Sequence, residues 1–176
     1  METRQKKTLE ALQTSIQMEI DGKAFYLKAS HESNNIAGKK LLARLSDEED
    51  THRQKFEKIY IGLQDKNAWP ATDYQPDGGK RLRTILTEVI ESSSTNTGTS
   101  ITELDAVQTA IDMETKTYDF YSRQTRGATY NAEREFYQAL AAEEREHHLI
   151  LTDYYEYLKD PAAWFVNKEH PSLDGG

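Results

Sequence analysis

Apolar residues recur along two N-terminal stretches of the chain at alternating steps of three and four positions. Residues 8–33 carry the series Leu9, Leu12, Ile16, Glu19, Lys23 and Tyr26. Residues 37–63 carry the series Leu45, Glu49, His52, Phe56, Ile59 and Leu63. Such steps place side chains on one face of an α-helix. The pattern predicts two long helices whose short connection makes them an antiparallel hairpin, residues 8–63.

The same pattern returns in the second half and predicts another helix hairpin, residues 101–158. Its third helix carries the series Leu104, Val107, Ile111, Glu114, Tyr118 and Tyr121. Its fourth helix carries the series Leu140, Glu144, His147, Leu151, Tyr154 and Leu158. Gly127 is expected to end the third helix and Pro161 the fourth. The C-terminal tail, residues 159–176, shows no periodic pattern.

Residues 64–100, between the hairpins, lack a long periodic stretch. Pro70, Pro76 and the Gly78–Gly79 pair interrupt any long helix. We expect one short helix over residues 80–91 and then a polar loop, SSSTNTGTS. A connection of this length can cross a bundle. The expected fold is therefore all-α, a ferritin-like four-helix bundle with one long crossover, in a single domain of residues 1–176.

The two hairpins are internal repeats. The segment ALQTSIQMEIDGKAFYLKAS, from Ala11, aligns without a gap on AVQTAIDMETKTYDFYSRQT, from Ala106. The same offset of 95 residues also superposes the Glu and His residues of the second and fourth helices. One offset shared by two helices and a turn indicates a duplicated hairpin. We expect a pseudo-twofold axis between the halves.

Composition narrows the functional classes. The 176 residues have a net charge of −8 and no cysteine. The charge argues against nucleic acid and anionic membrane partners, and no stretch approaches the roughly 20 apolar residues of a membrane helix. The missing cysteines exclude disulfides, thiol nucleophiles and cysteine-ligated metals from these residues. We expect no secretory signal and a cytoplasmic location.

Charged residues in the four seams predict a metal site. Bundle seams favour aliphatic side chains, yet each seam here has a glutamate near its middle: Glu19, Glu49, Glu114 and Glu144. Burying one unpaired carboxylate costs several kcal/mol, against a total domain stability of about 5–15 kcal/mol. Two divalent cations would balance four carboxylates.

Histidine spacing supports this interpretation. His52 and His147 each follow a seam glutamate by three residues, so each Glu–His pair lies on one helix face. One Glu from each of two helices and Glu-x-x-His from each of the others is the ligand pattern of ferritin-like di-iron proteins. Mixed carboxylate and imidazole ligation suits iron or manganese and is compatible with zinc.

Several residues near the proposed ligands are expected to have other roles. Glu48 and Glu143 leave the seam, so we expect them to point away, into partner contacts or solvent. Tyr26 and Tyr121 lie seven residues after Glu19 and Glu114, on the same faces. They are candidate catalytic residues that hydrogen-bond a ligand or supply a proton or electron, with core filling as the equal alternative. The remaining residues are expected to be surface histidines or covering tryptophans: His31, His148, His170, Trp69 and Trp164.

The motifs MEIDGKAFY, EEDTH, METKTYDFY and EEREH together resemble the ferritin-like domain of the rubrerythrin family. The resemblance extends from about Thr8 to Leu158. It implies a non-haem di-iron centre that reduces hydrogen peroxide or dioxygen, and a homodimer. Exchange of helix hairpins between protomers is compatible with the long crossover. Manganese or a mixed metal pair would use the same ligands.

Two features depart from the family pattern. Typical rubrerythrins carry a rubredoxin domain with a four-cysteine iron site, so this chain would need an external electron donor such as a separate rubredoxin-type protein. Many also have a ligand glutamate three residues after the third-helix one, where this chain has Thr117, with Gly22 as its repeat mate. The redox-linked movement of iron between Glu and His, associated with rubrerythrin peroxidases, uses that additional glutamate and is therefore not predicted for this chain.

The leading hypothesis is a di-iron peroxidase or oxidase. In it, Glu49 and Glu144 bridge two irons, Glu19 and Glu114 bind more terminally, and the two histidines each cap one iron. A ferroxidase or iron-handling protein is an alternative that shares every ligand. A non-enzymatic bundle stabilised by its metal is another.

Overall fold

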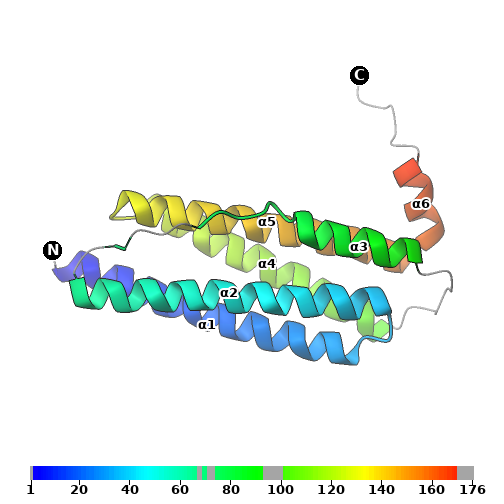
Figure 1. The fold of residues 1–176 in the computed structure, drawn as a ribbon, viewed down its shortest axis with the longest axis horizontal. Coiled ribbons are helices and arrows are strands. Elements are labelled where there is room, and N and C mark those ends of the chain that lie inside the picture. The colour runs from blue at the N-terminus through cyan, green and yellow to red at the C-terminus, as the bar shows by residue number, and fades with distance from the viewer. Residues whose placement is uncertain (1, 67–68, 71–73, 93–100, 170–176) are drawn as a thin grey trace, which may run out of the picture.

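The structure, a computed structural model, describes residues 2–66, 69–70, 74–92 and 101–169. Within these ranges the chain forms six helices and no strand: α1 (Glu2–Glu32), α2 (Ile36–Lys66), α3 (Lys80–Ser92), α4 (Ile101–Gly127), α5 (Asn131–Lys159) and α6 (Pro161–Glu169). Helices α1 and α2 form one hairpin and α4 and α5 form the other (Figure 1). The prediction of an all-α bundle is confirmed, although α1 begins six residues earlier than the sequence pattern suggested.

The crossover contributes the predicted short helix. Asp77 Oδ1 accepts a hydrogen bond from the backbone N–H of Gly79 at 2.8 Å. Gly78 and Gly79 have φ angles of 66° and 72°, which side chains with a Cβ rarely adopt. This turn leads into α3, which packs against both α2 and α5. The predicted loop after Ser92 lies outside the described residues.

The C-terminal tail contains a helix that the sequence analysis did not predict. Pro161 follows the end of α5, as expected, but it also begins α6. Proline suits the first turn of a helix because its missing N–H has no partner there in any case. Asp160 Oδ1 accepts the N–H of Ala163 at 3.0 Å and so caps the new helix.

Two apolar clusters fill the ends of the bundle. One joins the C-terminal halves of α1 and α5 to the N-terminal halves of α2 and α4, and Leu41, Leu45 and Leu151 are among its members. The other fills the opposite end and is rich in aromatic residues, including Phe56, Phe136 and Tyr137. Between them lies a band of buried charged residues. None of the helices in the described ranges has the length and apolar character needed to cross a membrane.

Candidate metal centre

Glutamate and histidine side chains from all four long helices meet in this band. They are Glu19 of α1, Glu49 and His52 of α2, Glu114 of α4, and Glu144 and His147 of α5. None is more than 4% exposed. The structure thus brings together all six residues that the seam pattern selected.

Their ligand atoms form two overlapping groups, within each of which all atoms lie within 4.8 Å of one another. The first group is Glu19, Glu49, His52 and Glu144. The second is Glu49, Glu114, Glu144 and His147. Each group offers three carboxylates and one imidazole. Glu49 and Glu144 belong to both, and they are the pair predicted to bridge.

Several buried atoms of this cluster lack hydrogen bonds. Among the described residues, no hydrogen bond reaches Glu19 Oε2, Glu49 Oε1, either carboxylate oxygen of Glu144, or Nδ1 of His52 and His147. These atoms only face one another, with Nδ1 to carboxylate distances of 3.3–3.7 Å. Buried polar atoms almost always have partners, because an unsatisfied one costs about 1–3 kcal/mol. Metal ions would give every one of these atoms a ligand role. The residues present therefore fit a two-metal centre.

The electrostatics point the same way. Burial and then repulsion from neighbouring carboxylates raise the pKa of Glu49 and of Glu144 well above its usual value. Burial also opposes ionisation of Glu114, but the contact with His147 outweighs it and lowers this pKa. Burial lowers the pKa of both histidines, yet the surrounding glutamates outweigh it and raise both values. Without cations, the cluster retains protons that divalent metal ions would replace.

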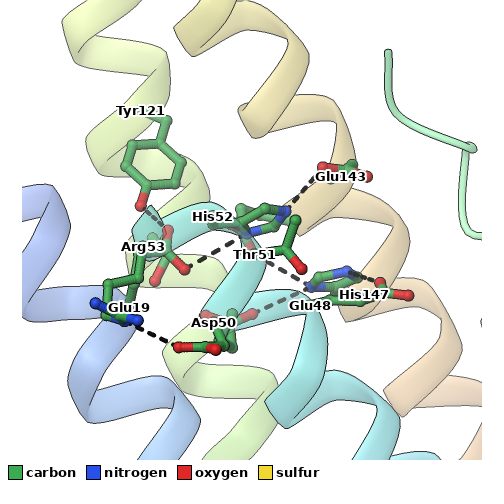
Figure 2. A network of polar contacts seen from close by, with 12 residues as sticks. Glu19, Glu48, Asp50, Thr51, His52, Arg53, Tyr121, Glu143 and His147 are labelled. Atoms are coloured by element: carbon green, nitrogen blue, oxygen red, sulfur yellow. Dashed lines mark hydrogen bonds and ion pairs between the residues drawn. The ribbon is translucent and has the colours of Figure 1, made fainter. Parts of the chain in front are cut away.

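The prediction for Glu48 and Glu143 was wrong, because each binds a histidine of the opposite hairpin. Glu143 Oε2 lies 2.9 Å from His52 Nε2, and Glu48 Oε2 lies 3.1 Å from His147 Nε2 (Figure 2). With each Nδ1 facing the cluster, Nε2–H donates to the outer carboxylate. Such a contact fixes the ring tautomer and raises the basicity of the ligand atom. Arg44 also donates to Glu48 at 2.9 Å.

The two candidate tyrosines also connect the hairpins. Tyr121 donates a hydrogen bond to Glu19 Oε1 (Figure 2), and Tyr26 donates one to Glu114 Oε1. Both rings are at most 1% exposed and belong to the apolar clusters. The tyrosines thus fill the core and position a carboxylate, while a catalytic role stays a prediction. Burial and the adjacent glutamate raise both phenol pKa values well above the usual one.

Gly22 leaves room for one of the shared carboxylates. A Cβ atom at this position would lie 2.8 Å from Glu49 Oε2, closer than a real contact allows. Its repeat mate Thr117 instead donates to the carbonyl of Met113 at 3.1 Å. Neither position supplies a carboxylate, so the cluster keeps four glutamates and two histidines.

One contact at the site was missed by the sequence analysis. Tyr74, in the crossover before α3, places its hydroxyl 3.1 Å from His52 Nε2. Its ring packs edge-on against the His52 ring, with centroids 6.1 Å apart. Because this segment has no helical periodicity, nothing in the sequence indicated which way the side chain would point.

The remaining histidines and tryptophans lie away from the cluster. His31 is exposed, and half-buried His148 contacts Thr115 Oγ1 through Nδ1 at 3.2 Å. His170 lies outside the described residues. The two tryptophans have covering roles, as expected: Trp69 packs on Phe136 and Tyr137, and Trp164 packs on Tyr157.

Comparison with known proteins adds one finding. The family model described as Rubrerythrin matches residues 10–155, which include every residue of the cluster. No curated protein and no solved structure gave a match.

Proposed function

The chain belongs to the rubrerythrin family, and we propose that it is a non-haem di-iron oxidoreductase that reduces hydrogen peroxide or dioxygen. The observation that carries the proposal is the set of buried oxygen and nitrogen atoms in the cluster that face one another without a hydrogen bond. Their number and type suit two iron ions, although manganese would use the same ligands. Family membership then favours redox chemistry over a purely structural metal.

The six residues would divide the work of holding the metal pair. His52 and Glu19 would hold one ion, His147 and Glu114 the other, and Glu49 and Glu144 both. Two ferrous ions supply the two electrons that convert one peroxide and two protons into two waters. The apolar clusters on either side keep bulk water from the charged centre.

The tyrosines hold protons within this dry site. Tyr26 and Tyr121 stay neutral because burial and the neighbouring carboxylate raise the pKa of each phenol. Each therefore donates through its O–H to a ligand carboxylate, which orients that carboxylate. We propose that the same O–H groups, which contact Glu114 and Glu19, supply protons during turnover.

Electrons for repeated turnover would come from outside these residues. With no cysteine in the sequence, the chain holds no four-cysteine iron site of its own. We therefore propose a one-electron carrier protein as the physiological reductant.

An anaerobic Fe(II) titration of metal-free protein, followed by rapid mixing with peroxide or dioxygen, tests the proposal. We expect saturation at two irons per chain and faster oxidation by peroxide than by dioxygen. Accumulation of many more irons per chain under excess Fe(II) would instead indicate an iron-handling protein. No stoichiometric iron binding would contradict the di-iron proposal.

Glu49→Ala supplies the matching variant. We expect it to lose both iron binding and peroxide reduction, because Glu49 belongs to both ligand groups. Asp47→Asn is the control, since Asp47 lies on the same helix but is exposed. Full iron content and rate in Glu49→Ala would contradict the bridging role.

A further inference from the structure

Three tyrosines hydrogen-bond residues of the cluster, but they differ in exposure. Tyr26 and Tyr121 are 1% and 0% exposed, whereas Tyr74 is half-buried and so reaches the surface. Lys55 Nζ lies 3.5 Å from the centroid of the Tyr74 ring, which holds the ring in place and adds positive charge beside it. Tyr74 thus joins the surface to His52.

The orientation of His52 determines whether its contact with Tyr74 can transfer a proton or an electron. Its Nδ1 faces the cluster, where it would bind metal, and its Nε2 meets both Tyr74 and Glu143. A ring bound to metal through Nδ1 cannot hand a proton onward through that atom without releasing the metal. An electron needs no vacant nitrogen. The contact is therefore suited to electrons and unsuited to protons.

His147 has no aromatic contact of this kind, but its ring lies close enough to His52 to use the contact with Tyr74. The corresponding contact of His147 goes through Glu48 to Arg44, neither of which has an aromatic ring. The rings of His52 and His147 are nearly parallel, with centroids 6.0 Å apart and an interplanar angle of 12°. An electron that reaches His52 is therefore close to the ligands of both metal positions.

We propose that Tyr74 is an electron relay between an external one-electron carrier and the metal centre, acting through His52. This inference rests on the proposed function. In each transfer the carrier loses one electron and one ferric ion becomes ferrous, so two transfers restore the pair. The tyrosine is neither oxidised nor reduced on balance, and no proton passes through His52. The positive charge of Lys55 favours an acidic carrier.

The absence of native cysteine allows a direct test. Gln75→Cys, at an exposed position beside Tyr74, would carry a ruthenium polypyridyl photosensitiser, and Lys28→Cys, exposed on α1, would carry it in the control protein. A laser pulse then injects one electron into ferric protein, and absorbance follows its arrival at the metal. We expect Tyr74→Leu to slow arrival several-fold from position 75 and to leave arrival from position 28 unchanged. Tyr74→Trp, which keeps an aromatic ring, should restore most of the rate.

Two further measurements distinguish a failure of the electron relay from a failure of the proposed function. Iron content and the peroxide oxidation rate should be unchanged in Tyr74→Leu, whereas reduction by a reduced rubredoxin, used as the probe carrier, should slow. An unchanged rate from position 75, or an equal loss from both label positions, would overturn the relay. If the unsubstituted protein binds no iron or does not react with peroxide, the proposed function itself fails.

Discussion

The two halves of the metal centre are alike on the inside and different on the outside. Around each histidine the structure repeats the same set: one glutamate on the near side, one tyrosine bound to that glutamate, and an outer carboxylate on Nε2. Beyond this set the halves diverge. The outer carboxylate at His147 is held by Arg44, whereas His52 meets Tyr74 from the crossover.

The divergence follows the duplication. Every member of the inner set has a repeat mate at the offset of 95 residues. Arg44 instead falls on Ala139, and Tyr74 lies in the unrepeated crossover. Inherited symmetry therefore determines the metal ligands, while unrepeated residues make the surroundings of the two positions unequal. This gives each residue of one half an internal control in the other.

The largest expected effect is a difference in bound metal between variants of the shared carboxylates and variants of the histidines. Glu144→Ala should remove both metal ions, as Glu49→Ala should, because each residue belongs to both ligand groups. His52→Ala should remove only one ion, because His52 belongs to one group. Metal analysis after anaerobic loading measures the difference. Loss of a single ion from Glu144→Ala would contradict the shared role.

The next effect tests whether each outer carboxylate supports the histidine of the opposite hairpin. Glu143 is a sequence neighbour of His147, but it contacts His52. We expect Glu143→Gln to weaken the metal position beside His52 by about 10–100-fold, the usual cost of losing such a partner. Glu48→Gln should do the same at His147. Titration with Co(II), followed by visible absorption, measures the affinities. Repeating it in His52→Ala and in His147→Ala, each of which should keep one position, assigns the weakened one.

The control for this pair is Glu146→Gln, whose carboxylate binds Arg83 of α3 and lies outside the cluster. It should leave both positions unchanged. If Glu143→Gln instead weakened the position beside His147, the contacts between hairpins would have to be reassigned.

A third effect concerns pH and should involve both halves. In the metal-free cluster the pKa values of Glu49, Glu144 and both histidines are raised. Metal binding needs these groups deprotonated, so it releases protons and its affinity falls as pH decreases. Each proton released changes the affinity by up to about tenfold per pH unit. Calorimetry in buffers of different ionisation enthalpy counts the protons, and an affinity independent of pH would contradict the prediction.

The sequence predicted the inner set well because its signals are local and duplicated. Seam spacing alone selected Glu19, Glu49 and His52 together with their repeat mates, and the structure brings all of them together. The hairpins followed from periodicity and short connections. These features depend on helix geometry, which a single chain displays directly.

The outer contacts depend on how separate elements meet. Glu48 lies one position off the seam, about 100° around the helix, so periodicity could not tell solvent from a facing histidine. Tyr74 has no periodic context at all. The missed helix α6 is a different case: Asp160 followed by Pro161 is an N-terminal helix signal that the absence of a long apolar pattern concealed.

The smallest effect is a matched pair that tests whether the inner halves are equal. Tyr26→Phe and Tyr121→Phe each remove one hydrogen bond to a buried ligand carboxylate. We expect each to lower the free energy of unfolding by about 1–2 kcal/mol and to leave two metal ions bound, because the carboxylate keeps its metal. Denaturant unfolding of the metal-loaded proteins measures the loss. Tyr60→Phe, which loses only contacts with Gln13 and Gln64 near the surface, serves as control. A clearly larger loss for one tyrosine would show that the inequality of the outer contacts extends into the inner set.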